Sequence, residues 1–567
     1  MATELLDFWV VIFFSLLGVI LTTRLKLPSV VGVLFFGVLV GPHALGLVGD
    51  TEIIPLLSEL GAILLLFFIG IEFNVDKILK FGLRAALVFL LKFGTVFLLT
   101  YIAALLLNLQ ILDALLIAVL LSFSSTAIFA RLVSDSVIQN REETLFVSAV
   151  LIIEDIFAIF ILTALSHLRL SEAVSLESVF LSTLVSLLIL SFSYLVLRWA
   201  VVRLSIWLEE KNMEAQLFSA LSLCALLSSI AVFFGLSPAI GAFLAGSVFS
   251  STPVFRKVEH ALQQLILLFS AFFFFSIGMQ VNPVFLLAAF GIILFFTLLN
   301  LFLKFFSVSL SSYLLGYESR SAVFSGLLLL TISEFALLIA IQANGLTSFD
   351  LVSFSAALLF FSGLGAALLF PLEASINAKL SAVFPLSTKS RLKNLSLYMD
   401  QFVSRFEPGG AFYQAFIGHA RQLFSYGAFV VLVVASFSIM QPYLLPLLSY
   451  SLGPIRGTDL LMIAIILYPS YRLLQIIHVL LGEFAEAFHR VDRSRTNGKN
   501  RMLADFFFFF FFFSLSFLLP LVLSLLSLPH FLQTISLVPL FISFAFVWDL
   551  AHLATLRLRP SSKPASR

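Results

Sequence analysis

Apolar stretches long enough to cross a lipid bilayer fill most of this chain. A transmembrane helix needs about 20 predominantly apolar residues, and only helices and closed barrels pair every backbone group inside hydrocarbon. The 567 residues are 61% hydrophobic and only 11% charged, whereas about half apolar is ordinary for a soluble protein. The sequence therefore predicts an all-α membrane protein that crosses the bilayer many times.

Thirteen spans are predicted before residue 375. They lie near residues 8–23, 27–48, 53–71, 85–108, 112–133, 144–167, 174–200, 213–235, 236–251, 263–281, 284–312, 319–342 and 349–374. Four further candidates lie near 424–447, 459–480, 504–528 and 533–555. We expect a transmembrane domain over 1–375, a cytoplasmic basic linker over 376–423, and an additional transmembrane region of unknown function over 424–567.

The basic residues predict the orientation of these spans. Nearly all of the 33 Lys and Arg residues fall in alternate loops, and the opposite loops hold only Arg169 and Arg456. The positive-inside rule then predicts that the N-terminus lies outside and the C-terminus in the cytoplasm. We expect a multi-pass protein of the cell (inner) membrane.

Two pairs of segments repeat at nearly one spacing. The second span reads LPSVVGVLFFGVL and the ninth LSPAIGAFLAGSV; the third ends FFIGIEFN and the tenth FFSIGMQVN. The matched spans lie seven helices apart, an odd number, so the two copies cross the membrane in opposite directions. Inverted repeats of this kind build many secondary transporters, which bind substrate between the repeats near the midplane. The alternative is a chance match between small residues that recur in membrane helices.

Clusters of hydroxyl side chains interrupt two spans at the same spacing. Ser122-Phe-Ser124-Ser125-Thr126 in the fifth span aligns with Thr331-Ile-Ser333-Glu334 in the twelfth. Such side chains satisfy backbone groups that an unwound helix leaves free, and the ends of the half-helices then offer dipoles to an ion. We expect both spans to be broken; the alternative is that the hydroxyls bond within intact helices.

Adjacent carboxylates, Glu154 and Asp155, lie in the middle of the sixth span. One carboxylate at bilayer depth costs about 2.5–3.5 kcal/mol on insertion scales, so packing alone does not account for two. An acid at this depth can exchange a proton for a cation. We predict Asp155 as the exchanging group, with Ser124, Ser125 and Thr126 supplying oxygen ligands.

Further charged residues within spans include Lys304, Lys92 and Glu334. Lys304 needs a buried partner, and Glu154 is the candidate because it too is charged and intramembrane. Lys92 lies about two turns from the cytoplasmic end of its span and is interpreted as snorkelling to the interface. Glu334 is left with two interpretations: it caps a broken half-helix, or it contacts the cation path.

These motifs resemble the monovalent cation:proton antiporter-2 family, which includes the Kef-type potassium efflux systems and sodium–proton antiporters. The resemblance covers residues 8–375 and includes ELGAILLLFFIGIE, SSTAIFARLV, the carboxylate pair and SEFALLIA. It implies a thirteen-helix homodimer in which the two broken helices cross and a core domain moves against a dimerisation domain. Asp155 falls where the family binds cation and proton in turn. Glu154 stands where relatives carry Asp, Asn or Gln, which leaves the ion and the stoichiometry open.

The expected function is exchange of Na⁺ or K⁺ for protons by alternating access. A gated potassium efflux channel-like protein and an ion sensor without net turnover are the alternatives. An intramembrane protease is disfavoured, because Gly363-Leu-Gly365 is followed by Ala366 rather than by the aspartate of a GxGD motif. After residue 375 no strand is followed by GxGxxG, so no nucleotide-binding domain is expected. Neither a cofactor nor a nucleic-acid partner is expected.

Overall fold

The computed structural model describes residues 2–25, 27–48, 53–72, 75–133, 141–170, 211–233, 237–250 and 254–383, with isolated positions elsewhere. The chain divides into two compact units, 1–174 with 189–403, and 175–188 with 404–567. In the second unit, the short strands β1 (Ser451–Leu452) and β2 (Ile455–Arg456) pair antiparallel. The helices described next belong to the first unit.

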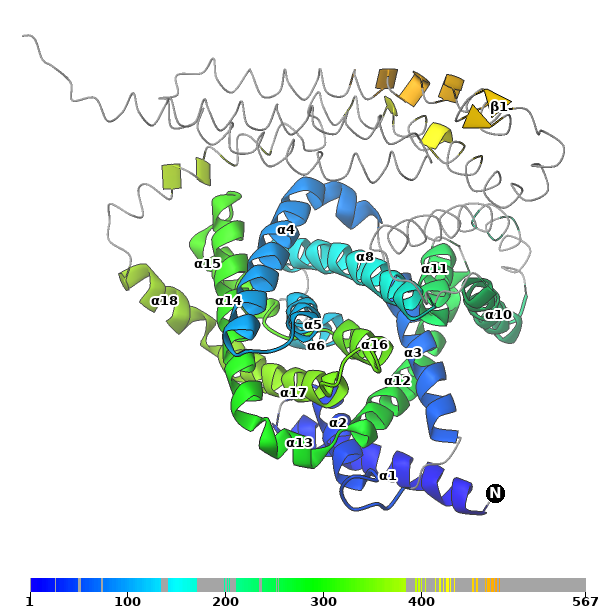
Figure 1. Ribbon diagram of the computed structural model, residues 1–567, viewed down its shortest axis with the longest axis vertical. Helices are drawn as coiled ribbons and strands as arrows, with labels where there is room; N and C mark the ends of the chain where they lie inside the picture. The colour runs from blue at the N-terminus through cyan, green and yellow to red at the C-terminus, as the bar shows by residue number, and fades with distance from the viewer. Residues whose placement is uncertain are drawn as a thin grey trace, which may run out of the picture. The chain divides into compact units, whose positions relative to one another are not determined.

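Within the described ranges of the first unit, the chain is a bundle of helices (Figure 1). In chain order they are α1 (Ala2–Leu25), α2 (Ser29–Val40), α3 (Ile53–Glu72), α4 (Val75–Leu106), α5 (Ile111–Ser122), α6 (Thr126–Leu132), α8 (Glu142–Leu170), α10 (Met213–Phe233), α11 (Pro238–Ser250), α12 (Phe255–Gln280), α13 (Pro283–Ala288), α14 (Phe290–Leu314), α15 (Ser319–Leu328), α16 (Glu334–Ala343), α17 (Leu351–Leu369) and α18 (Glu373–Val383). The 3₁₀ turn η1 (Phe370–Leu372) joins the last two.

In this part of the chain, eight helical segments are long and apolar enough to cross a membrane, and four shorter apolar helices accompany them. Twelve of the thirteen predicted spans coincide with helices, so the prediction of a multi-pass all-α protein is confirmed. The seventh predicted span, 174–200, the linker prediction beyond residue 383 and the four C-terminal candidates fall outside the continuously described residues.

Two predicted spans differ in detail from the helices observed. The span over 27–48 contains a helix only to Val40, because Gly41 leaves helical geometry and Pro42 cannot continue an α-helix. The span over 284–312 is divided into α13 and α14 at Ala289.

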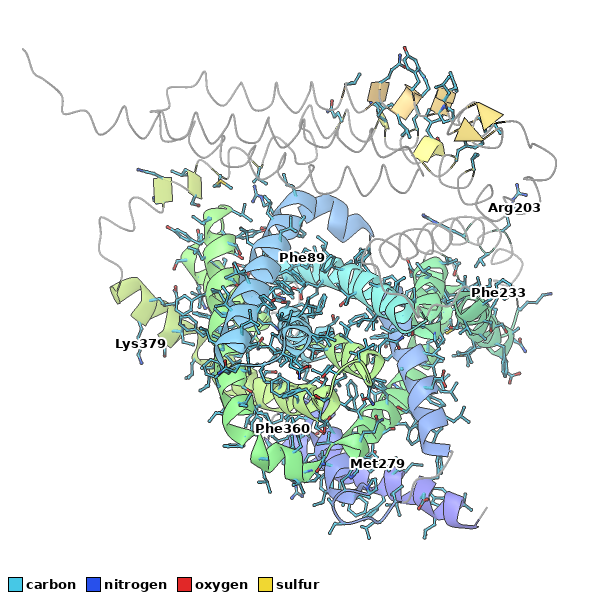
Figure 2. All side chains as sticks on the ribbon, viewed as in Figure 1. Phe89, Arg203, Phe233, Met279, Phe360 and Lys379 are labelled. Carbon is cyan, nitrogen blue, oxygen red and sulfur yellow. The ribbon has the colours of Figure 1, made fainter. Side chains whose placement is uncertain are left out.

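The outer surface of the bundle is apolar, as expected for a protein surrounded by lipid. Leu106, Phe233 and Leu287 are 78–84% exposed, and Figure 2 shows Phe233 at the outside of the bundle. Between the helices, phenylalanines fill the core; fully buried examples are Phe123, Phe275, Phe296, Phe335 and Phe354.

The helices of the first unit form two groups. In one, α2 packs on α1 and α12, and α3 packs on α11 and α12, while α10 covers α11. In the other, α4 packs on α5, α8 and α14, while α17 packs on α14 and α16. We call these the scaffold group (α1, α2, α3, α10, α11, α12) and the core group (α4, α5, α6, α8, α14, α15, α16, α17). Helix α17 connects them through contacts with α2 and α12.

Packing in the scaffold group follows the predicted repeat. The aligned pairs are Gly37 with Gly246 and Gly70 with Gly278. A Cβ atom on any of the four would overlap a backbone carbonyl of the facing helix, in the α2–α12 crossing for Gly37 and Gly278 and in the α3–α11 crossing for Gly70 and Gly246. Equivalent glycines therefore allow equivalent close crossings in the two copies, which supports the inverted repeat.

Both predicted breaks are present. Helix α5 ends at Ser122 and α6 begins at Thr126; α15 ends at Leu328 and α16 begins at Glu334. The two breaks lie against each other, because the Ser333 N–H donates to the Phe123 carbonyl at 3.2 Å. The prediction of two crossed broken helices is confirmed.

Candidate ion-binding site

Four helix ends meet where the broken spans cross. Serine caps restart both half-helices: the Ser125 hydroxyl accepts from the Ile128 N–H at 3.1 Å, and the Ser333 hydroxyl accepts from the Phe335 N–H at 3.1 Å. Helix N-terminal ends carry partial positive charge and C-terminal ends partial negative charge. The crossing therefore juxtaposes opposite dipole ends in the buried interior of the bundle, where charged side chains can balance them.

Glu334 lies at the two N-terminal ends. One carboxylate oxygen accepts from the Ser125 hydroxyl at 2.7 Å, and the other accepts from the Ala127 N–H at 3.2 Å. Its side chain is buried, and it occupies the first turn of α16. Of the two roles left open by the sequence, these contacts support capping, with the carboxylate capping the half-helix α6 of the other repeat.

Lys304 lies at the two C-terminal ends. From α14 its ammonium donates to the Phe123 carbonyl at 2.6 Å and to the Thr331 carbonyl at 2.7 Å. These carbonyls follow the ends of α5 and α15, so one buried cation balances the negative ends of both half-helices.

Glu154 forms its ion pair with Lys92, not with Lys304. The Lys92 Nζ lies 2.6 Å from Glu154 Oε2, and neither side chain is more than 1% exposed. The predicted pairing of Glu154 with Lys304 is therefore wrong, as is the interpretation that Lys92 snorkels to the interface. The physical reason is packing: α4, which carries Lys92, packs directly on α8, whereas α14 packs on α4, α15 and α17.

Ser124 joins this ion pair to the break. Its N–H donates to Glu154 Oε2 at 2.8 Å, and its hydroxyl accepts from Lys92 Nζ at 2.7 Å. The same hydroxyl donates to the Leu329 carbonyl at the end of α15, at 3.0 Å. The pair is thus fixed to the backbone of one break and, through Ser124, to the other.

Asp155 faces a different neighbour. Consecutive residues of a helix point about 100° apart, and the Asp155 carboxylate accepts from the Thr126 hydroxyl at 3.3 Å, at the start of α6. Its side chain is only 4% exposed. The predicted hydroxyl cluster is therefore divided: Thr126 contacts Asp155, Ser124 contacts the Glu154–Lys92 pair, and Ser125 contacts Glu334.

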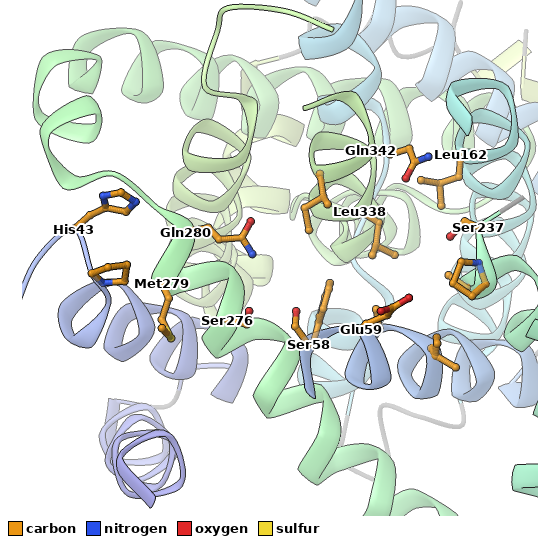
Figure 3. A pocket seen from close by; sticks show the side chains of 17 residues that line it. His43, Ser58, Glu59, Leu162, Ser237, Ser276, Met279, Gln280, Leu338 and Gln342 are labelled. Atoms are coloured by element: carbon orange, nitrogen blue, oxygen red, sulfur yellow. The ribbon is translucent and has the colours of Figure 1, made fainter. Parts of the chain in front are cut away.

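A cavity of about 710 Å³ lies between the scaffold and core groups (Figure 3). Its walls come from α3, α11 and α12 on one side and from α8 and α16 on the other. Leu162 lines it from α8, two turns and about 10 Å beyond Asp155 on the same helix face. Leu338 lines it from α16, one turn beyond Glu334. The cavity therefore approaches the crossing from one side of the membrane.

The role of Lys92 was missed, although the sequence contains a signal for it. Residues 90–96 read LLKFGTV and residues 302–308 read FLKFFSV, which places Lys92 and Lys304 at matching positions of α4 and α14. The helices that carry the acceptors also match. The Ser362 hydroxyl on α17 accepts from the Ile332 N–H of the second break at 3.1 Å, much as Glu154 on α8 accepts from the Ser124 N–H of the first break. Extending the repeat to these segments would have marked Lys92 as a residue of the crossing.

The chain is similar in sequence to proteins named as cation/proton antiporters. The chain is 28% identical over 334 residues to the probable Na⁺/H⁺ antiporter GerT of Bacillus cereus, covering 58% of this chain and 87% of that protein. It is 27% identical over 337 residues to the K⁺/H⁺ antiporter subunit KhtU of Bacillus subtilis, covering 57% and 81%.

The fold also matches a solved structure. The sodium proton antiporter MjNhaP1 of Methanocaldococcus jannaschii superposes with a TM-score of 0.50 at 17% identity, over 67% of this chain and 99% of that one. At this identity the match indicates a shared fold and nothing further. Residues 10–374, with both broken helices and both carboxylates, match the transmembrane sodium/hydrogen exchanger family. Because that match covers more than half of the chain, the protein belongs to the sodium/hydrogen exchanger family of membrane transporters.

Proposed function

We propose that this protein exchanges a monovalent cation, Na⁺ or K⁺, for protons, and that Asp155 holds the two in turn. The observation that carries the proposal is the position of Asp155, buried beside the first helix break with its carboxylate against the Thr126 hydroxyl. The other two acids of the crossing are engaged elsewhere: Glu154 by Lys92 and Glu334 by the N-terminal end of α6.

The chemistry is competition for one carboxylate. Burial in a medium of low dielectric constant makes an unneutralised charge costly, so the site favours states in which a proton or a cation neutralises it. The Thr126 oxygen can turn a lone pair to the cation, and hard cations prefer oxygen ligands. Because the empty, charged site is costly to carry through the membrane, each passage carries one of the two ions.

Alternating access follows from the division into two helix groups. A displacement of the core group along the scaffold group would close the cavity beside Leu162 and open a path from the other side. In the orientation that the basic residues predict, the cavity lies at the outer ends of the helices. We further propose a homodimer in the cell (inner) membrane, with the N-terminus outside, a cytoplasmic linker over 376–423 and an additional membrane region over 424–567.

Reconstitution of the purified full chain in proteoliposomes tests the proposal. A pH-sensitive dye reports the dissipation of an imposed proton gradient when Na⁺, K⁺ or Li⁺ is added. We expect Asp155→Asn to abolish the response. Asp113→Asn serves as the matched control, because Asp113 is also a buried intramembrane aspartate but lies in the first turn of α5, away from the break. Full activity of Asp155→Asn would remove Asp155 from the mechanism, and ion flux that persists without a pH gradient would indicate a channel.

A further inference from the structure

We propose that α18 positions the second broken helix and moves with the core group, so that residues 404–567 are attached to the part of the protein that moves. The inference rests on the proposed function, because it takes the core group to be displaced along the scaffold group. It also gives the first part of the proposed linker, residues 376–383, a role of its own.

One face of α18 packs on α15. The half-buried residues of α18 recur at the helical spacing i, i+3, i+4 and i+7: Glu373, Ile376, Asn377 and Leu380. Ile376 and Leu380 pack into an apolar cluster. Its other members include two residues of α15 and one of the second break: Val323, Leu327 and Leu330. Helix α18 therefore packs on the helix that ends at the second break and shares an apolar cluster with a residue of the break itself.

Polar contacts hold the start of α18 to the start of α15. The Arg320 Nε donates to Glu373 Oε1 at 2.9 Å. The Ser319 hydroxyl donates to Asn377 Oδ1, one helical turn further along α18, at 3.0 Å. Both contacts are exposed, so each contributes little to stability by itself. Together they fix the register in which the apolar face of α18 meets α15.

Further contacts connect this region to other helices of the core group. The Ser321 hydroxyl on α15 donates to Glu143 in the first turn of α8, the helix that carries Asp155. Beyond α18, the Ser396 hydroxyl donates to the Tyr313 carbonyl of α14 at 2.7 Å. Because α8, α14 and α15 all belong to the core group, these contacts assign α18 to that group as well.

Helix α15 ends where the crossing of the broken helices begins. The Leu329 carbonyl accepts from the Ser124 hydroxyl, and the Thr331 carbonyl accepts from Lys304. Without α18 at its side, α15 could shift against these contacts, which would slow the displacement of the core group. Asp155 contacts α6 at the first break instead. We therefore expect α18 to set the rate of exchange and to leave the affinity for the cation unchanged.

A crosslink tests which helices move together. The substitutions Ser319→Cys and Asn377→Cys place two thiols across the α15–α18 contact, in the full chain with Cys224→Ser, and a short reducible thiol crosslinker joins them. In proteoliposomes, we expect cation-driven dissipation of the proton gradient to stay within about twofold of the uncrosslinked protein, because the two helices keep their relative position throughout the cycle. A crosslink that stops exchange until a reductant cleaves it would overturn the inference.

A second crosslink is the matched control. Phe35→Cys and Phe360→Cys join α2 of the scaffold group to α17 of the core group, where the two native rings lie 6.3 Å apart. This crosslink should reduce exchange by about tenfold or more, because it ties together the two groups that we propose to move. Unimpaired exchange here would overturn the inference while leaving cation–proton exchange itself intact. Absence of exchange in the wild type would refute the proposed function.

Two pairs of substitutions separate positioning from a merely structural role. Ile376→Ser with Leu380→Ser removes the apolar contact, and we expect kcat per folded protein to fall roughly fivefold while the half-saturating cation concentration stays within about twofold. Ala374→Ser with Ala378→Ser alters the exposed face of α18 and should leave both unchanged. The α15–α18 crosslink should restore kcat in the first variant. Unchanged kcat in that variant, or a raised half-saturating concentration, would contradict the positioning role.

Discussion

Replacing Lys304 with methionine tests how the crossing of the broken helices is stabilised. Methionine has nearly the length of lysine but no donor, so the change removes the ammonium while leaving the apolar stem. The Phe123 carbonyl keeps the Ser333 N–H at 3.2 Å, whereas the Thr331 carbonyl loses its contact with Lys304. An orphaned buried carbonyl costs about 1–3 kcal/mol, and loss of a cation from two helix C-terminal ends costs about 0.3–1 kcal/mol at each.

Removing the ammonium also relieves the cost of burying it, which opposes these losses. We therefore expect Lys304→Met to lower the free energy of unfolding by about 2 kcal/mol, measured by equilibrium denaturation in detergent micelles. Lys379→Met is the control, because Lys379 is exposed on α18 (Figure 2) and its loss should lie within error of the wild type. A Lys304→Met protein as stable as the wild type would refute the argument that the ammonium balances the two helix ends.

Two further predictions concern the cavity and the helix crossings. Glu59 is the only Asp or Glu among the residues that line the cavity, which include no Lys or Arg, so Glu59→Gln should raise the half-saturating cation concentration roughly two- to fivefold at low salt. The effect should act only from the side that the cavity faces and should disappear at high ionic strength, where the Debye length becomes short; a lower kcat at unchanged half-saturation would contradict this role. Gly246→Ala should destabilise the protein by about 1–3 kcal/mol, because the added methyl group meets the Phe67 backbone. By contrast, Gly94→Ala in α4, where nothing lies within 4 Å of the added Cβ, should stabilise it by about 0.5–1 kcal/mol; equal effects would refute the steric argument.

The spans and their two breaks were predictable because their signals are local. Apolar length sets where a helix can cross, and the hydroxyl cluster at 122–126 marks a helix that can be interrupted without leaving backbone groups unpaired. The repeat added long-range information, since an odd helix separation fixes the relative direction of the two copies. These features can be predicted from the type of residue and its position along a span, without knowing which helices pack together.

The partner of Glu154 was not predictable in the same way. Two intramembrane lysines were available, and which of them reaches Glu154 depends on which helix packs against α8. That choice is made by the contacts of α4 with α8 and α14, which no local pattern encodes. Glu334 illustrates the same limit: its own helix begins at that residue, but its carboxylate also accepts a hydrogen bond from the Ala127 N–H in the other repeat.

The charges at the crossing together account for a monovalent cargo. Lys304 and Glu334 each balance two helix ends, Lys92 forms an ion pair with Glu154, and Asp155 is the acid whose charge we propose the bound ion neutralises. One proton or one alkali cation does so, whereas a divalent cation would leave a positive excess in a region of low dielectric constant, where an uncompensated charge is strongly disfavoured. The ends of the broken helices are therefore balanced by Lys304 and Glu334, residues other than Asp155, the acid that we propose holds the ion.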